Sequence, residues 1–190
     1  MMLSITVQIL LAWLLADILT GAVHWFEDTY MDSFSLNFLN SIAEDNDLHH
    51  RKPTAMLLSS GFTNIRSAVA VGWPLAFILW WYSFPIVVWL IPFFSSFGNL
   101  IHRWAHKPKK QLPFWIKAIQ KTGLFISHEH HQKHHASMGD LIPKHLARKK
   151  FCPMTNWLNP WLDLIHFWDI LEFMISMFGL HPTRKKYLRK

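Results

Sequence analysis

The sequence predicts an all-α integral membrane protein with about three transmembrane helices and a cytosolic, histidine-rich helical cap. Two uncharged stretches are the first observation: residues 1–16 and the 35 residues from 67 to 101 contain no Asp, Glu, Lys or Arg. Mostly apolar stretches of this kind are typical of bilayer spans. The second observation is that nine of the 13 histidines fall into four short groups near the ends of these stretches. The length of 190 residues predicts a single membrane-embedded domain, 1–190.

Composition excludes several classes of protein. A hydrophobic content of 51% excludes intrinsic disorder, and a single cysteine, Cys152, excludes a disulfide scaffold. The net charge of +7 is unevenly placed, because all 19 basic residues lie from Arg51 onward while the first 50 residues hold seven of the twelve acids. No helix-turn-helix, zinc-finger or RNA-binding motif accompanies the basic excess. We therefore expect no nucleic-acid partner.

The first span is predicted at about 3–23, which is long enough for a hydrocarbon core of about 30 Å at about 1.5 Å per residue. It lacks a basic leader and a small-residue cleavage site, so we expect it to be retained. The second apolar stretch would extend about 52 Å as one helix, so it must fold back. Proline disfavours helix at the preceding residue, and Ser83-Phe84-Pro85 is the predicted break between spans at about 64–82 and 85–102.

Three spans place 25–63 and 103–190 on the same side of the membrane, where they form the cap. The Lys and Arg residues lie on this side, and the positive-inside rule makes it cytosolic. We expect the endoplasmic reticulum membrane in a eukaryote or the inner membrane in a bacterium. Within the cap, 112–126 and 157–178 are apolar but interrupted by charges, and predict helices that lie on the membrane or cover the domain. Residues 137–150 predict a loop.

The clustered histidines are candidate metal ligands. They are His24, His49, His50, His102, His106, His130, His131, His134 and His135. Three pairs are spaced by four residues, namely 102/106, 130/134 and 131/135. Such residues share a helix face, so each pair is spaced to hold one ion. A lone histidine is more often an ordinary core or surface residue, but four within six residues would repel one another if protonated, and metal binding keeps imidazoles neutral.

The number of histidines predicts more than one metal. Eight or nine imidazoles are too many for one four-coordinate zinc, and no cysteine pairs are present. Imidazole suits iron, zinc, copper and nickel, so ligand type alone does not choose the metal. Asp28 lies four residues after His24 and is a further candidate, as an oxygen ligand or as a partner that orients an imidazole. An N-cap or a solvated acid is an equally open interpretation of Asp28.

Several motifs together resemble one family. They are Ala16-Asp17 through His24 to Asp28-Thr29, His49-His50 with Pro53-Thr54-Ala55, Asn99 to His106, the HHQKHH motif at 130–135, and Phe151 to Asn159. In this order, over about residues 15–175, they resemble the Kua-type lipid desaturase family, which includes plasmanylethanolamine desaturases and a plant plastid branch. The resemblance implies a membrane enzyme with two iron ions that uses O2 as co-substrate and an external electron donor. It also implies that all nine histidines above are catalytic iron ligands.

The expected function follows from this resemblance and from the chemistry. Removing hydrogen from an unactivated alkyl carbon requires a redox metal with O2, because side-chain acids and bases cannot do it. We expect O2-dependent desaturation of a phospholipid substrate, forming the vinyl ether of plasmalogens from an alkyl ether lipid. The sequence contains no flavin, haem or nicotinamide motif, so a cytochrome b5 or ferredoxin-type donor is expected to dock on the basic face.

Other functions remain open. The same iron site would serve desaturation of an acyl chain on a phospholipid, or lipid hydroxylation. A metal transporter needs ionisable groups along its path, and Tyr82 is the only ionisable side chain between residues 67 and 101. A structural membrane protein with incidental histidines would bind no metal.

Overall fold

A computed structural model of the chain describes residues 3–30, 44–46, 48–138 and 150–182. The regular structure in these ranges is entirely helical, which confirms the predicted all-α class. The α-helices are α1 (Ile5–Tyr30), α3 (Gly61–Trp81), α4 (Ile86–Ser95), α5 (Gly98–His106), α6 (Phe114–Thr122), α7 (His128–Met138), α8 (Asn159–Leu164) and α9 (Phe167–Ser176), and residues 44–46 and 48–51 are also helical. Two 3-10 turns, η2 (Pro53–Leu57) and η3 (Lys109–Gln111), lie between them.

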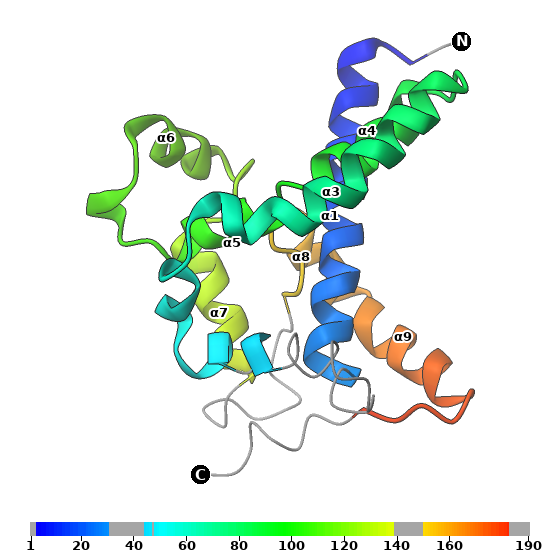
Figure 1. Cartoon of the computed structure of the whole chain (residues 1–190). Coiled ribbons are helices and arrows are strands. Elements are labelled where there is room, and N and C mark those ends of the chain that lie inside the picture. The colour runs from blue at the N-terminus through cyan, green and yellow to red at the C-terminus, as the bar shows by residue number, and fades with distance from the viewer. Residues whose placement is uncertain (1–2, 31–43, 47, 139–149, 183–190) are drawn as a thin grey trace.

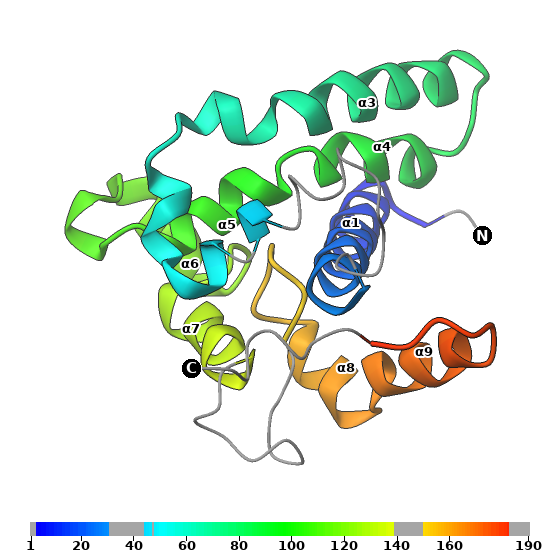
Figure 2. The same ribbon diagram turned by 60° about the horizontal axis from the view of Figure 1, so that its bottom comes forward.

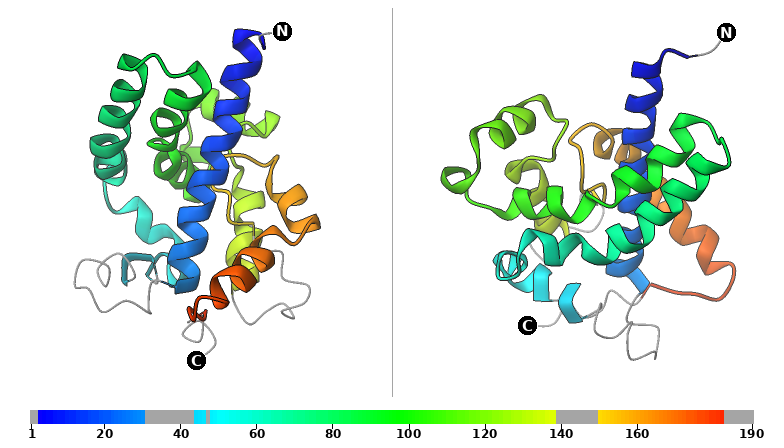
Figure 3. Two further views of the ribbon diagram at one scale, coloured as in Figure 1. Left: turned by 90° about the vertical axis from the view of Figure 1, so that its right-hand side faces the viewer. Right: turned by 45° about the horizontal axis from the view of Figure 1, so that its top comes forward.

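Helix α1 runs the length of the molecule (Figure 3). Its 26 residues extend about 39 Å, which exceeds a hydrocarbon core of about 30 Å. The predicted span ended near residue 23, whereas the helix continues to Tyr30. The additional turns are stabilised by packing in the cap, because Trp25 and Tyr30 are buried in a cluster with Phe151 and Trp168.

Helices α3 and α4 form a hairpin beside α1. Ser60 caps α3 by accepting a hydrogen bond from the Thr63 amide at 3.0 Å, and the turn after the helix contains Ser83 at a φ of 58°. Pro85 then begins α4, so the structure has the break that the sequence predicted. Helix α4 packs against both α1 and α3, and lies between them in Figure 2. A Cβ atom at Gly72 would lie 2.6 Å from the Pro92 carbonyl oxygen, so this close approach requires glycine.

The predicted third span, 85–102, is not one straight helix. Helix α4 ends at Ser95 and α5 begins at Gly98, with a bend of 43° between them. The bend directs α5, with its two histidines, toward the cap. Helices α1 and α3 are each long and apolar enough to cross a membrane, and α4 with α5 makes a third candidate if the bent pair is one span. The chain therefore has two to three candidate spans, as expected of an integral membrane protein.

The two predicted cap helices are shorter than expected. Helix α6 ends at Thr122, because the next residue, Gly123, has a left-handed φ of 79°. The predicted helix 157–178 divides into α8 and α9 at His166, which has a φ of 53°. Of the predicted loop 137–150, residues 139–149 lie outside the described residues. Helices α6 and α9 lie on opposite sides of α1 (Figures 1 and 3), and each exposes large apolar side chains such as Trp115 and Phe173.

Candidate metal centre

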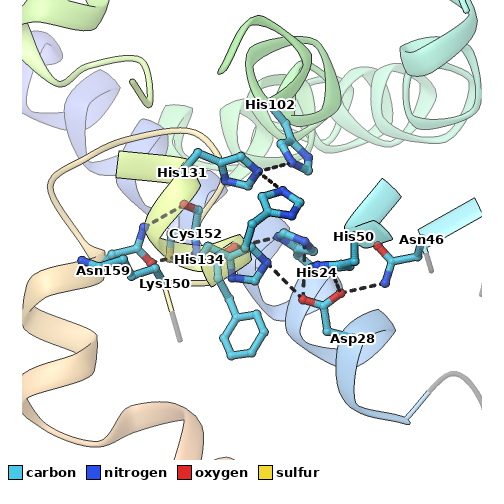
Figure 4. A network of polar contacts seen from close by, with 12 residues as sticks. His24, Asp28, Asn46, His50, His102, His131, His134, Lys150, Cys152 and Asn159 are labelled. Carbon is cyan, nitrogen blue, oxygen red and sulfur yellow. Dashed lines mark hydrogen bonds and ion pairs between the residues drawn. The ribbon is translucent and has the colours of Figure 1, made fainter. Parts of the chain in front are cut away.

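Histidines from four parts of the chain meet near the C-terminal end of α1. Figure 4 shows His24 and Asp28 from α1 facing His50 from the segment before η2, His102 from α5 and His134 from α7. They form two adjacent groups, within each of which the candidate ligand atoms lie within 4.8 Å of one another. The first group is His49, His102, His106, His131 and His135, and the second is His24, Asp28, His50 and His134.

The five-histidine group brings together more imidazole Nε2 atoms than hydrogen bonding can pair. His102, His106 and His131 form a triangle with Nε2 to Nε2 distances of 2.8, 2.9 and 3.1 Å. A hydrogen bond joins a protonated nitrogen to an unprotonated one, so three mutually adjacent nitrogens cannot all be paired in this way. In addition, both ring nitrogens of His49 are buried and make no hydrogen bond within the described residues. The arrangement is that of lone pairs directed at a shared cation.

The nitrogen separations also indicate a coordination geometry. With metal–nitrogen bonds of about 2.1 Å, ligand nitrogens at right angles lie about 3.0 Å apart, and tetrahedral ones about 3.4 Å apart. The separations within the triangle, and the 3.0 Å between Nε2 of His131 and His135, match the right-angled case. Five imidazoles around one point exceed the four ligands of structural zinc. The group therefore fits a metal with five or six ligands.

The second group contains the only carboxylate of the two groups found in the described residues. Asp28 Oδ1 lies 2.7 Å from both His50 Nε2 and Asn46 Nδ2, which can donate hydrogen bonds to it. Its other oxygen, Oδ2, lies 3.5 Å from His24 Nε2 and 3.3 Å from His134 Nε2. Within the part of the chain that the structure describes, Asp28 Oδ2 and His24 Nε2 are buried and make no hydrogen bond. Buried polar atoms that face one another without a hydrogen bond fit a metal ion bound between them.

Burial keeps the histidines of the cap in the form that binds metal. Desolvation, followed by the charge of neighbouring histidines, lowers the pKa of His49, His131 and His135 below the ordinary value of 6.5. Neutral imidazole carries the lone pair that a metal requires, so no proton has to be displaced at neutral pH.

Comparison with known proteins identifies the family. A model of the lipid desaturase domain matches residues 13–185. The chain belongs to the lipid desaturase family. This confirms the resemblance that the sequence motifs showed, and it makes the chain a member of a family of membrane oxidoreductases.

Individual relatives of the lipid desaturase family differ in their named substrates. A probable fatty acid desaturase of Acanthamoeba polyphaga mimivirus is 30% identical over 187 residues, 95% of this chain and 88% of that protein. Mouse plasmanylethanolamine desaturase 1 is 28% identical over 180 residues, 86% of this chain and 62% of the mouse protein. The chloroplastic fatty acid desaturase 4 of Arabidopsis thaliana is 28% identical over 175 residues, 90% of this chain and 51% of the plant protein. This chain thus spans only part of the mouse and plant relatives. No solved structure matches it.

The structure does not place every predicted ligand of the lipid desaturase in the two groups. His130 belongs to neither, and its Nε2 lies 3.3 Å from the side-chain nitrogen of Asn159. The sequence paired it with His134 on one ion, but at 100° per residue His130 lies at the edge of the arc that faces the centre. His131, His134 and His135 occupy the rest of the arc. The other eight predicted histidines and Asp28 come together.

Two further residues beside the centre were not predicted from the sequence. Asn46 is bonded to Asp28, and the Phe151 carbonyl oxygen lies 3.2 Å from His24 Nδ1. A carbonyl can only accept, so His24 carries its proton on Nδ1 and directs Nε2 into the second group. The spacing of four residues between Asn46 and His50 could have indicated that Asn46 faces the centre, whereas no sequence pattern indicates which backbone carbonyl contacts a histidine.

Proposed function

We propose that this chain is a di-iron lipid desaturase that forms the vinyl ether of plasmalogens from an alkyl ether phospholipid. The observation that supports it best is the pair of adjacent groups, one of five imidazoles and one of three imidazoles with a carboxylate. Two ions in these groups would share a protein wall made by α1, α5 and α7. Membership of the lipid desaturase family supplies the substrate class.

The proposed ligands divide between the two ions. His49, His102, His106, His131 and His135 would hold one iron, and His24, Asp28, His50 and His134 the other. Iron bound there would use O2 and external electrons to remove two hydrogens from adjacent carbons of the lipid chain. The protein holds the imidazoles neutral, shields the centre from water and orients His24 and Asp28 through the Phe151 carbonyl and Asn46.

The position of the centre along α1 favours carbons near the lipid head group. His24 lies 19 residues after Ile5, the first residue of α1, which places it about 28 Å along a helix that crosses a core of about 30 Å. A site at this depth reaches the first carbons of a chain rather than its middle. A vinyl ether forms between the first two carbons of an alkyl chain. The exposed apolar side chains of α6 and α9 support a cap seated on the membrane surface.

The proposed electron donor is a separate acidic protein. Exposed Lys52 and Lys133 lie within two residues of the ligands His50 and His134. Basic side chains this near the centre would attract an acidic carrier such as cytochrome b5 or a ferredoxin to the cytosolic face.

Tags inserted in 31–45 and after Lys190 should both be cytosolic, and a tag before Met1 should be on the opposite side. Finding the first two tags on different sides would contradict the three-span topology.

The test of the reaction is restoration of an acid-labile lipid. Expression in cells that lack plasmanylethanolamine desaturase should restore vinyl ether phospholipids, measured by mass spectrometry before and after acid treatment. The His131→Ala variant, produced at the same level, should not. A product with a new double bond only in an acyl chain, or one that gains an oxygen, would refute the vinyl ether assignment in favour of an acyl desaturase or a hydroxylase.

A further inference from the structure

One stripe of α1 does more than supply metal ligands. Asp17, Gly21, His24 and Asp28 are buried and lie within about 60° of one another around the helix, at 100° per residue. Two of the four, Asp17 and Gly21, belong to neither metal group. Both contact the 151–156 segment, the stretch of chain that precedes α8.

The 151–156 segment runs antiparallel to this stripe in a defined register. Asp17 accepts hydrogen bonds from the Met154 amide at 2.8 Å, the Thr155 amide at 3.2 Å and the Thr155 hydroxyl at 2.7 Å. Four residues further along α1, Gly21 lies against Cys152, where a Cβ would be 2.9 Å from its Sγ and 3.1 Å from its Cα. The register therefore depends on a carboxylate at 17 and on the missing side chain at 21.

The register ends at a metal-binding histidine. Phe151, at the end of the segment, presents its carbonyl oxygen to His24 Nδ1 at 3.2 Å. Asn159 holds the same end, because its side chain bonds both the amide and the carbonyl of Cys152 at 2.9 Å. Asp17, Asn159 and Phe151 are all fully buried. The direction of the His24 ring is thus set by a backbone group, and that backbone group is held at residues 17, 21 and 159.

We propose that Asp17 is a positioning residue of the carboxylate-containing metal group, acting through the 151–156 segment on His24. Its role is to hold the segment so that the Phe151 carbonyl selects the His24 tautomer and directs Nε2 toward Asp28. Gly21 has the matching role of admitting the segment to the surface of α1. This inference rests on the proposed di-iron function, and it concerns one of the two metal groups only.

Two substitutions disturb the register in different ways. Asp17→Asn keeps the size of the side chain but replaces one acceptor oxygen by an NH2 group, so at least one of the three donors meets another donor. Gly21→Ala displaces Cys152 and, because alanine favours helix over glycine, does so without weakening α1. Ser96→Ala is the control. It removes a buried hydroxyl that accepts from Trp73 Nε1 at 3.0 Å and joins α3 to the α4–α5 connection instead.

The measurement is anaerobic Fe(II) titration of the purified full-length protein in detergent, with Mössbauer spectra of the loaded samples. In both Asp17→Asn and Gly21→Ala, one of the two irons should bind about 10- to 100-fold more weakly. The signal that disappears should be that of the carboxylate-containing site, while the five-histidine site keeps its spectrum. Ser96→Ala should bind both irons as the wild type does, even with a lower melting temperature.

Two results would overturn the proposal. One is wild-type affinity and spectra in both register variants, and the other is the same loss of iron in Ser96→Ala, which would reduce the effect to general destabilisation. Wild-type protein that binds no iron would instead refute the proposed function. The same titration separates these outcomes.

Discussion

The four histidines of the HHQKHH motif in α7 should respond differently to substitution, although the sequence presents them as one motif. His134 Nε2 lies 3.3 Å from Asp28 Oδ2 within the second metal group, whereas the Nε2 atom of His130 lies 3.3 Å from Asn159. We predict that His130→Ala retains two irons per chain and that His134→Ala retains one. The two variants change the same residue type on the same helix, so each serves as the control for the other.

The two substitutions should weaken different properties, namely folding stability in His130→Ala and metal affinity in His134→Ala. His130→Ala removes one neutral hydrogen bond, which costs about 1 kcal/mol of unfolding free energy and about 2–4 °C in melting temperature for a protein of this size. His134→Ala removes one of four ligands from the second group. Loss of a residue that merely orients a ligand weakens metal binding about 10- to 100-fold, and loss of a ligand itself should exceed that.

The assay is iron content per chain, measured together with the melting temperature and with restored vinyl ether lipid in cells. His131→Ala provides a third point, because it should empty the five-histidine group instead. Loss of iron in His130→Ala to the same extent as in His134→Ala would refute the division of ligands. Retention of both irons in His134→Ala would refute the second group as a metal site.

Three further predictions concern pH, helix packing and membrane contact. Burial lowers the pKa of His130 from 6.5 to about 4 in the folded protein. As the pH falls, the unfolded chain therefore binds a proton at this residue before the folded chain does, and metal-free protein should lose stability between about pH 6.5 and about pH 4. A melting temperature constant over this range would contradict the prediction. Gly72→Ala should lower the unfolding free energy by about 1–3 kcal/mol, measured by denaturation in detergent, because the added Cβ would lie 2.6 Å from the Pro92 carbonyl oxygen. An unchanged unfolding free energy would contradict the packing of α3 on α4. A spin label at Phe173→Cys should be relaxed more by O2 than by a water-soluble nickel chelate, because this exposed ring lies on the apolar surface of α9. Stronger relaxation by the chelate would contradict lipid contact along α9.

Much of the fold was predictable because it depends on local composition. Uncharged stretches of bilayer length predicted α1 and α3, and the residues around Pro85 predicted the hairpin. The bend between α4 and α5 was not predicted in this way, since 85–102 contains no Asp, Glu, Lys or Arg to interrupt the span. It depends on packing, and Gly98 contacts Thr20 of α1 so closely that an added Cβ would lie 2.9 Å from its side chain.

The sequence by itself determined which side chains are available to the centre. Spacing by four residues on a helix is a local property, so it predicted that His102 and His106 share one ion, as their common group allows. Which residues share an ion across helices depends on how α1, α5 and α7 cross, and only the tertiary structure placed His134 with His24 and His131 with His102. The same holds for Asp17 and the Phe151 carbonyl, which are 134 residues apart along the chain and act on one histidine through contacts of backbone groups. Backbone groups are the same in every residue, so a sequence cannot show which of them a folded chain brings to a metal ligand.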